Sequence, residues 1–399
     1  MDTQKIIELS EKFLMRTYAR LPLIIDKGKG IKVWDKEGKE YLDFISGIGV
    51  NAIGHSHPKI LKTIKKQSQK LLHCSNLYYI EPQIKLAEKL SYLSFADKVF
   101  FSNSGAEANE AAIKLARKFG VKKSGKENEC YEIITMENSF HGRTLTTITA
   151  TGQTKYQKGF SPLPPGFKYA PFNNLKGVER IISKKTCAIM IEPIQGEGGI
   201  NIAKESFLKG LRELCDKKEI LLILDEVQCG LGRTGKLFAY QHYGIEPDIM
   251  TLAKPLGGGL PIGATLAKES VASCFEPGDH ASTFGGNPLV CACALTFLEI
   301  LEEENLVEKA QKRGEYFKNK LNGLKKKFPF IKEIRGKGLM VGIELKFEAK
   351  NIVEECRKEG LLINSTSKNV LRFLPPLIVK ENEINQAVEI LNRVLSRRK

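Results

Sequence analysis

Short apolar runs alternate with helical patterns through the middle of the chain, from about residue 75 to residue 265. In segments such as 109–119 and 207–217, apolar residues recur every three or four positions, which predicts amphipathic helices. The runs that predict buried strands most clearly are residues 99–101, 133–136, 188–191, 220–224 and 249–252. This alternation favours a mainly parallel sheet with helices on both faces, so we expect an α/β fold.

The two ends of the chain predict a second, smaller unit. Residues 31–44 alternate between apolar and polar on either side of a turn, which predicts a hairpin. A helical stretch over 288–326 leads to shorter elements, namely strands at 340–345 and 370–373 and a last helix over 381–396. We therefore expect an N-terminal segment (1–50) that packs with the small domain, a large domain (51–287), and a linking helix with the C-terminal small α/β domain (288–399).

The composition is that of an ordinary globular protein, with 42% hydrophobic and 27% charged residues. The net charge of +16 is high, but the basic residues are spread along the chain and no recognised nucleic-acid module accompanies them. We therefore expect no nucleic-acid partner. The same charge suits the attraction of anionic small molecules.

The cysteines and the N-terminus indicate a cytoplasmic protein. Nine cysteines without a CxxC pair, in a chain of 399 residues, favour free thiols in a reducing compartment. Residues 1–15 mix acidic and basic side chains and lack the apolar core of a secretory signal. No segment reaches the roughly 18 consecutive apolar residues of a membrane span, so we expect no membrane partner.

Two charged residues at the ends of apolar runs carry the strongest chemical signal. Asp225 follows the run 220–224, and Lys254 follows the run 249–253. In open α/β sheets, ligands bind at the carboxyl ends of the strands. A lysine held there can attack a carbonyl as a neutral amine, and a carboxylate can hold a protonated ring nitrogen. Pyridoxal phosphate requires these two groups, although either residue alone could be a solvated strand end.

A predicted helix start supplies a place for a phosphate. Residues 102–109 follow a strand and open a helix in which Ser104 can be the N-cap and Glu107 can close a capping box. The free N–H groups and the dipole of a helix start bind anions, and Gly105 lets the backbone approach closely. A capped helix start and a phosphate site are compatible here.

Further candidate residues lie in loops after strands and within one strand. Phe140 and Arg143 suit stacking on a planar ring and gripping a carboxylate. Arg372 interrupts the apolar strand 370–373 and needs a partner if it is buried, for which Glu197 or a substrate carboxylate is suitable. Considered singly, Phe140 would more often be a core residue, and the two arginines could lie on the surface.

With these motifs in order, the chain resembles the class III, or ω-type, pyridoxal-phosphate aminotransferases of fold type I. The matching segments run through almost the whole chain: 54–58, 104–108, 140–144, 192–199, 224–228, 232–235, 253–254, 282–288 and 371–377. Each motif alone is modest, but their combination in this order is specific. The resemblance implies a large, mainly parallel-sheet domain sandwiched by helices and a smaller α/β domain.

The resemblance also implies how the cofactor is held. Lys254 would bond to the cofactor and shuttle the proton, while Asp225 would pair with the pyridine nitrogen. The other implied cofactor-binding residues are Gly105, Ala106, Phe140, Glu226, Val227, Gln228 and Thr283. Of these, Thr283 would complete the phosphate site from the neighbouring subunit. The implied protein is a homodimer with shared active sites, and no metal is expected.

The implied substrate contacts involve a second set of residues. Arg143 would bind the distal carboxylate of the substrate, with Ser282 near the substrate, and Tyr18 would line the donor pocket. Arg372 would bind the α-carboxylate of 2-oxoglutarate. Glu197 would neutralise Arg372 when the amino donor occupies the site.

The implied reaction moves the terminal amino group of N2-acetyl-L-ornithine to 2-oxoglutarate, giving N-acetyl-L-glutamate 5-semialdehyde and L-glutamate, as in arginine biosynthesis. Ornithine, succinylornithine, N-succinyl-diaminopimelate and lysine-pathway donors suit the same framework. Two other classes are weaker alternatives. Residues 230–235 match the G-x-G-x-x-G pattern of nicotinamide-dependent oxidoreductases, but no clear helix follows them. A metal hydrolase built on His55 and His57 would lack a third ligand at zinc spacing.

Overall fold

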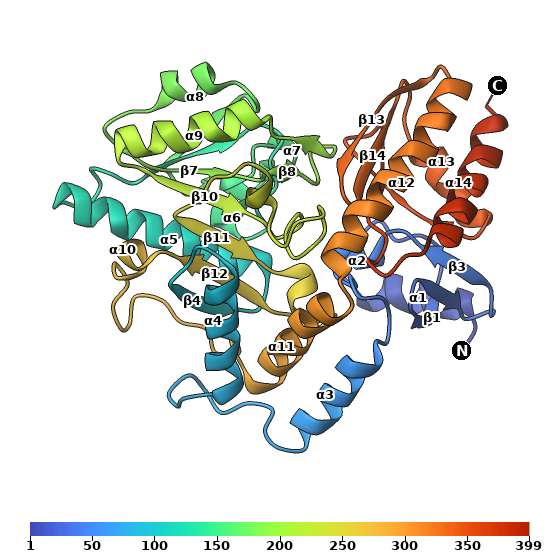
Figure 1. The fold of residues 1–399 in the computed structure, drawn as a ribbon, viewed down its shortest axis with the longest axis horizontal. Helices are drawn as coiled ribbons and strands as arrows, with labels where there is room; N and C mark the ends of the chain where they lie inside the picture. Colours follow the sequence, from blue (N-terminus) through green and yellow to red (C-terminus); the bar gives the residue numbers. More distant parts are fainter. Residues whose placement is uncertain (399) are drawn as a thin grey trace.

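A computed structural model describes residues 1–398, and a seven-stranded sheet forms the centre of the fold (Figure 1). Its strands, in spatial order, are β4 (Lys98–Ser102), β12 (Gly263–Ala267), β11 (Ile249–Leu252), β10 (Leu221–Asp225), β7 (Thr186–Ile191), β5 (Glu132–Met136) and β6 (Phe167–Ala170). Neighbouring strands from β11 to β6 are parallel, and β12 is antiparallel to both of its neighbours. The prediction of a mainly parallel α/β sheet is therefore confirmed.

Alternating side chains of the central strands bury themselves on opposite faces of this sheet. In β7, Ala188 and Met190 belong to the core that includes Ile113 of α5 (Gly105–Ser124). Ile189 and Ile191 point the other way and share a core with Phe207 of α9 (Glu205–Lys218). Since every residue of β7 is buried, the strand reads as a continuous apolar run, as expected for a sheet covered on both faces.

The C-terminal part forms a separate four-stranded sheet, in the order β13 (Ile331–Lys337), β14 (Met340–Leu345), β17 (Val370–Phe373), β16 (Asn364–Thr366). The helices α12 (Leu306–Lys327), α13 (Lys350–Lys358) and α14 (Glu381–Ser396) accompany it. The N-terminal strands β1 (Ile25–Lys29), β2 (Lys32–Asp35) and β3 (Glu40–Asp43) join β15 (Leu361–Leu362) in another sheet. Figure 1 shows both termini on this side of the molecule.

The stretch that reads as continuously helical is two helices in the structure. Helix α11 (Pro288–Glu303) ends shortly before Asn305, whose φ of 50° lies in the left-handed region, and α12 begins at Leu306. Asparagine adopts this conformation more readily than most residues, so it permits a sharp change of direction. The domain boundaries at residues 50/51 and 287/288 stay predictions. Among residues 1–398, none of the helices combines the length and apolar character needed to cross a membrane.

Candidate active site

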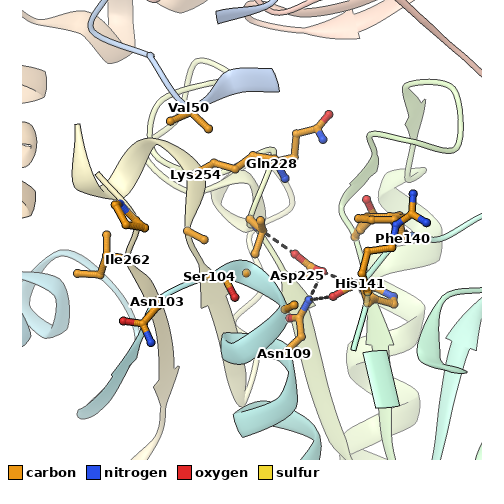
Figure 2. A pocket seen from close by; sticks show the side chains of 18 of the residues that line it. Val50, Asn103, Ser104, Asn109, Phe140, His141, Asp225, Gln228, Lys254 and Ile262 are labelled. Atoms are coloured by element: carbon orange, nitrogen blue, oxygen red, sulfur yellow. Dashed lines mark hydrogen bonds and ion pairs between the residues drawn. The ribbon is translucent and has the colours of Figure 1, made fainter. Parts of the chain in front are cut away.

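The carboxyl ends of β10 and β11 bring Asp225 and Lys254 to one cavity. The two strands are parallel neighbours in which Asp225 lies opposite Thr251, and the chain turns into a short 3-10 helix at Lys254–Gly257. Both residues line a cavity of about 460 Å³. In Figure 2, Lys254 and Gln228 lie above Asp225, which is hydrogen-bonded to Asn109 and His141. The prediction that matching strand ends place these two charges together therefore agrees with the geometry.

The backbone and surroundings of Lys254 both set this lysine apart. Its φ of 38° lies in the left-handed region, which a non-glycine residue rarely adopts and which costs on the order of 1–3 kcal/mol. Its side chain keeps some exposure through the cavity, yet its position deep in the molecule lowers the pKa of the ammonium. The nearby carboxylates of Asp225 and Glu197 act in the opposite direction. A lower pKa favours the neutral amine, which is the nucleophilic form.

A buried polar network holds the Asp225 carboxylate in place. Asn109 Nδ2 donates to Asp225 Oδ2 at 2.8 Å, His141 Nδ1 lies 2.8 Å from the same oxygen, and the Val227 N–H donates to Oδ1 at 3.0 Å. Asn109 is itself fixed, because its amide oxygen accepts from Thr251 Oγ1 at 2.7 Å. Burial lowers the pKa of the His141 imidazole, but the hydrogen bond to Asp225 and the charges of Asp225 and Glu192 together outweigh this effect and raise the pKa. The network therefore fixes the orientation of the Asp225 carboxylate at the cavity.

The start of helix α5 borders the cavity beside this network and has the capped geometry that the sequence predicted. Ser104 is the N-cap and accepts from the Glu107 N–H at 3.2 Å, while the Glu107 carboxylate accepts from the Asn103 N–H at 2.6 Å. The first-turn N–H groups of Gly105 and Ala106 have no partner within the helix and border the cavity. A β-carbon at position 105 would lie 2.7 Å from a methyl group of Val227, so the close approach requires glycine.

Arg372 and Glu197 form an ion pair next to the cavity. Arg372 lies on β17 with 1% of its surface exposed, and its Nη1 atom donates to the Glu197 carboxylate. It also donates from Nη1 to Gln228 Oε1 at 3.2 Å and from Nε to Asn364 Oδ1 at 3.1 Å. Burial raises the pKa of Glu197, but the charge and hydrogen bond of Arg372, together with Lys254 and Gln228, more than compensate and hold this pKa below its usual value. Gln228 links the pair to the cavity that it lines.

Glu192 is a cavity residue for which the sequence predicted no role of its own. Its Oε2 atom accepts from the Phe140 N–H at 2.9 Å, and its Oε1 atom accepts from the Gly196 N–H at 3.2 Å. It therefore braces two loops, one carrying Phe140 and the other carrying Glu197. Burial raises the pKa of Glu192 to about 7. The signal available in the sequence was its position directly after β7, which resembles that of Asp225 at the end of β10.

Six predicted site residues do not line this cavity within the single chain: Glu197 and Arg372 lie next to it, Glu226 lies behind it, and Ser282, Thr283 and Tyr18 lie apart from it. Ser282 and Thr283 border a neighbouring cavity of about 760 Å³, which is also lined by Leu77. Tyr18 is 74% exposed, and the Arg20 guanidinium lies over its ring at 5.2 Å. The structure thus gathers the predicted cofactor residues Gly105, Ala106, Phe140, Asp225, Val227, Gln228 and Lys254, together with Arg143, around one cavity.

Glu226 also lies away from the cavity surface, although it was expected among the cofactor-binding residues. Its carboxylate is buried and accepts from the backbone N–H groups of Ala239 and Tyr240 at 2.6 and 2.7 Å. Burial raises the pKa of Glu226 to about 8. These contacts give Glu226 a supporting position behind the cavity, where it fixes the chain at residues 239–240.

The residues present fit pyridoxal phosphate. The glycine-bearing helix start suits a phosphate, the Asp225 carboxylate suits a protonated ring nitrogen, and Lys254 suits the cofactor aldehyde. The histidines of the hydrolase alternative are occupied elsewhere, because His55 Nε2 lies 2.7 Å from Asp43 and His57 Nε2 lies 3.2 Å from Glu304. The fold and this site together define an α/β protein whose cavity presents a lysine amine, a helix start and a buried carboxylate.

The chain belongs to the class-III aminotransferases, whose family pattern matches residues 13–395. The chain is therefore a pyridoxal-phosphate-dependent aminotransferase with the fold of that family, and the predictions of fold, class and cofactor are confirmed. This also removes the nicotinamide-dependent alternative.

Individual relatives share this family. The chain is 55% identical over 396 residues, covering 99% of both sequences, to the acetylornithine aminotransferase of Methanocaldococcus jannaschii. Among solved structures, the ornithine aminotransferase from Toxoplasma gondii ME49 matches with a TM-score of 0.96 and 34% identity, covering 100% of this chain and 96% of that chain. The acetylornithine aminotransferase from Elizabethkingia anophelis matches with a TM-score of 0.90 and 37% identity over the full length of both chains.

Proposed function

We propose that this aminotransferase moves the terminal amino group of N2-acetyl-L-ornithine to 2-oxoglutarate. The observation that carries the proposal is the Glu197–Arg372 ion pair beside the cavity. The donor presents a methylene where 2-oxoglutarate presents a carboxylate, so one site must accept both. Paired with Glu197, the buried arginine is neutralised and tolerates the apolar donor. A substrate carboxylate can displace Glu197 and take its place.

Arg143 supports a donor that carries a carboxylate far from its reacting amine. It borders the cavity and forms no ion pair with any of residues 1–398. A free guanidinium at this position suits the α-carboxylate of acetylornithine, whose reacting amine lies at the other end of the molecule. It equally suits the distal carboxylate of 2-oxoglutarate.

Bound pyridoxal phosphate supplies an electron sink for the carbon that loses a proton. Lys254, in its neutral form, would hold the cofactor through its aldehyde, and its Nζ atom would move the proton of the substrate carbon. The Asp225 carboxylate would hold the ring-nitrogen proton, with Asn109 and His141 fixing its orientation. The Phe140 ring, at the cavity wall, would stack on the cofactor and help to exclude water.

We infer that the working enzyme is a homodimer in the cytoplasm. Thr283 is exposed and borders the neighbouring cavity, together with Leu77. Leu77 is 86% exposed, and Tyr79, two residues further along the chain, is 98% exposed. Such exposed apolar side chains suit burial against a second copy, which would bring Thr283 to the phosphate cradle of its partner. All nine cysteines are free thiols, which suits a reducing compartment.

Ornithine is the second candidate donor, because the ornithine aminotransferase from Toxoplasma gondii ME49 matches over the whole chain. Purified enzyme with pyridoxal phosphate and 2-oxoglutarate should be assayed with acetylornithine, ornithine, succinylornithine, N-succinyl-diaminopimelate and a lysine-pathway donor. We expect the highest kcat/KM with acetylornithine. A higher value for ornithine would replace the proposal, and the absence of glutamate formation with every donor would reject it.

A further inference from the structure

Tyr156 holds the Arg143 guanidinium at the cavity without lining the cavity itself. The Cζ atom of Arg143 lies over the Tyr156 ring at 4.2 Å from its centroid, and over the Phe140 ring at 5.6 Å. The two rings meet edge to face, with centroids 5.5 Å apart. Because no carboxylate among residues 1–398 pairs with Arg143, these aromatic contacts are what orients its guanidinium.

The segment that carries Tyr156 is fixed on both sides of the ring. Tyr156 lies on α7 (Thr154–Gln157). Gln153 Nε2 donates to the Ser139 carbonyl at 2.9 Å, and Gln157 Nε2 donates to the Thr151 carbonyl at 3.0 Å. Both acceptors belong to the stretch of chain that includes Phe140 and Arg143. These hydrogen bonds therefore fix the position of the Tyr156 ring relative to the Arg143 guanidinium.

We propose that Tyr156 is a positioning residue that selects substrates carrying a carboxylate distal to the reacting group. This rests on the proposed function, in which Arg143 receives that carboxylate. With one face covered by the Tyr156 ring, the guanidinium keeps its in-plane N–H donors free for a two-pronged grip. Lys155, whose Nζ lies 4.7 Å from the same ring centroid, adds a second positive charge nearby.

The proposal makes a claim that separates Tyr156 from the Glu197–Arg372 pair. Arg143 serves the donor in one half-reaction and 2-oxoglutarate in the other, so a Tyr156 defect raises KM for both substrates. A defect in the ion pair changes the balance between them instead. A substitution of Tyr156 should leave kcat unchanged with either substrate, because the ring lines neither the cavity nor the surface around Lys254.

The first test measures binding rather than turnover. N2-acetylnorvaline keeps the α-carboxylate of acetylornithine and lacks its reacting amine, and the corresponding carboxamide lacks the charge. We expect Tyr156→Leu and Tyr156→Met, in the cofactor-loaded protein, to weaken calorimetric binding of the acid by roughly 3- to 10-fold and to leave the carboxamide unchanged. Tyr156→Phe keeps the ring and should bind both probes as the wild type does.

Phe160→Leu is the matched control, because Phe160 is an exposed aromatic residue close by in the chain. It should change neither the binding of the probes nor KM. Equal loss of acid and carboxamide binding in both Tyr156 variants, or a fall in kcat with KM unchanged, overturns the proposal, as does wild-type behaviour of both variants. If wild-type enzyme fails to use acetylornithine but Tyr156→Leu still loses selective binding of the acid, the proposed function fails and the role of Tyr156 stands.

Discussion

His141 and Asp225 form a buried pair in which the ring nitrogen Nδ1 lies 2.8 Å from the carboxylate. Neither side chain meets bulk solvent, with 0% and 4% of their side-chain surfaces exposed. Asn109 Nδ2 and His141 Nδ1 both contact Oδ2 of Asp225, while the Val227 N–H donates to Oδ1. These contacts fix the orientation of the carboxylate. The position of the Asp225 carboxylate at the cavity therefore depends on both of these neighbours.

Asp225→Asn should retain pyridoxal phosphate but transaminate orders of magnitude more slowly. The neutral amide cannot hold the ring-nitrogen proton, so the electron sink weakens while the phosphate cradle stays intact. Cofactor content after dialysis and the single-turnover rate with donor measure the two effects separately. A near-normal rate would mean that another group serves the ring nitrogen.

Lys254→Ala should abolish transamination while the protein still folds. The variant loses both the amine that attacks the aldehyde and the group that moves the proton, and proton transfer alone contributes on the order of 10²–10⁴-fold. Steady-state turnover and thermal unfolding check the two parts of the prediction. More than a few per cent of wild-type turnover, without added amine, would contradict the role given to Lys254.

Glu197→Ala should leave Arg372 unpaired and shift the enzyme towards its acceptor. Affinity for glutamate and 2-oxoglutarate should hold or rise while the acetylornithine half-reaction weakens, with energies of ~2–5 kcal/mol for a fully desolvated charge. The Glu197 carbonyl accepts from the Thr366 hydroxyl, so only the side chain needs to move in the wild type.

The reverse change tests the same switch. Arg372→Ala should harm the glutamate half-reaction more than the acetylornithine half-reaction, because it removes the receptor for the α-carboxylate. Single-turnover measurements with each amino donor separately give both values. If the two substitutions slow both half-reactions equally, the pair is structural and no switch operates.

A charge in the exposed apolar surface should separate the subunits. Tyr79→Asp should sediment as a monomer and lose activity, because Thr283 would no longer reach the partner's phosphate cradle. Phe160→Asp, at a second exposed aromatic residue, should remain dimeric and active. Analytical ultracentrifugation at the assay concentration decides the outcome, and a wild-type enzyme that is active as a monomer would reject the shared site.

The burial of Glu226 should make stability fall as pH rises. Its folded-state pKa is about 8 against an ordinary 4.5, so between these values the folded chain keeps a proton that the unfolded chain has released. Glu226→Gln removes this group, and its free energy of unfolding should fall less steeply with pH, by up to about 1.4 kcal/mol per pH unit. Denaturant titrations across this range measure both slopes. Equal slopes would mean that the Ala239 and Tyr240 N–H groups keep the carboxylate ionised.

The sequence predicted those parts of the fold that follow from local patterns. The parallel strands β5, β7, β10 and β11 are long apolar runs, and α14 has a clear helical period. Strand β12 was missed because its residues Gly263 and Ala264 are small and give little signal, although its backbone pairs with two neighbours. The break at Asn305 depends on how α11 and α12 pack, which no local pattern contains.

The sequence likewise predicted some residues of the candidate site and missed others. Asp225 and Lys254 could be predicted because charges at strand ends are visible in sequence. Asn109 and Tyr156 could not, because one lies within a helix and the other in a short surface helix, and each matters only through a contact formed by folding. The roles of Thr283 and Tyr18 depend on contacts with a second subunit, so these roles stay predictions.

The two carboxylate receptors differ in how firmly the fold anchors them. Arg372 lies on β17, which is hydrogen-bonded to β14 on one side and β16 on the other. Arg143 lies on a loop and is oriented by side chains. Loops accept insertions and substitutions that a central strand does not. Changes in the Arg143 loop would therefore alter how the distal carboxylate of both substrates is held, whereas the sheet constrains the Arg372 receptor.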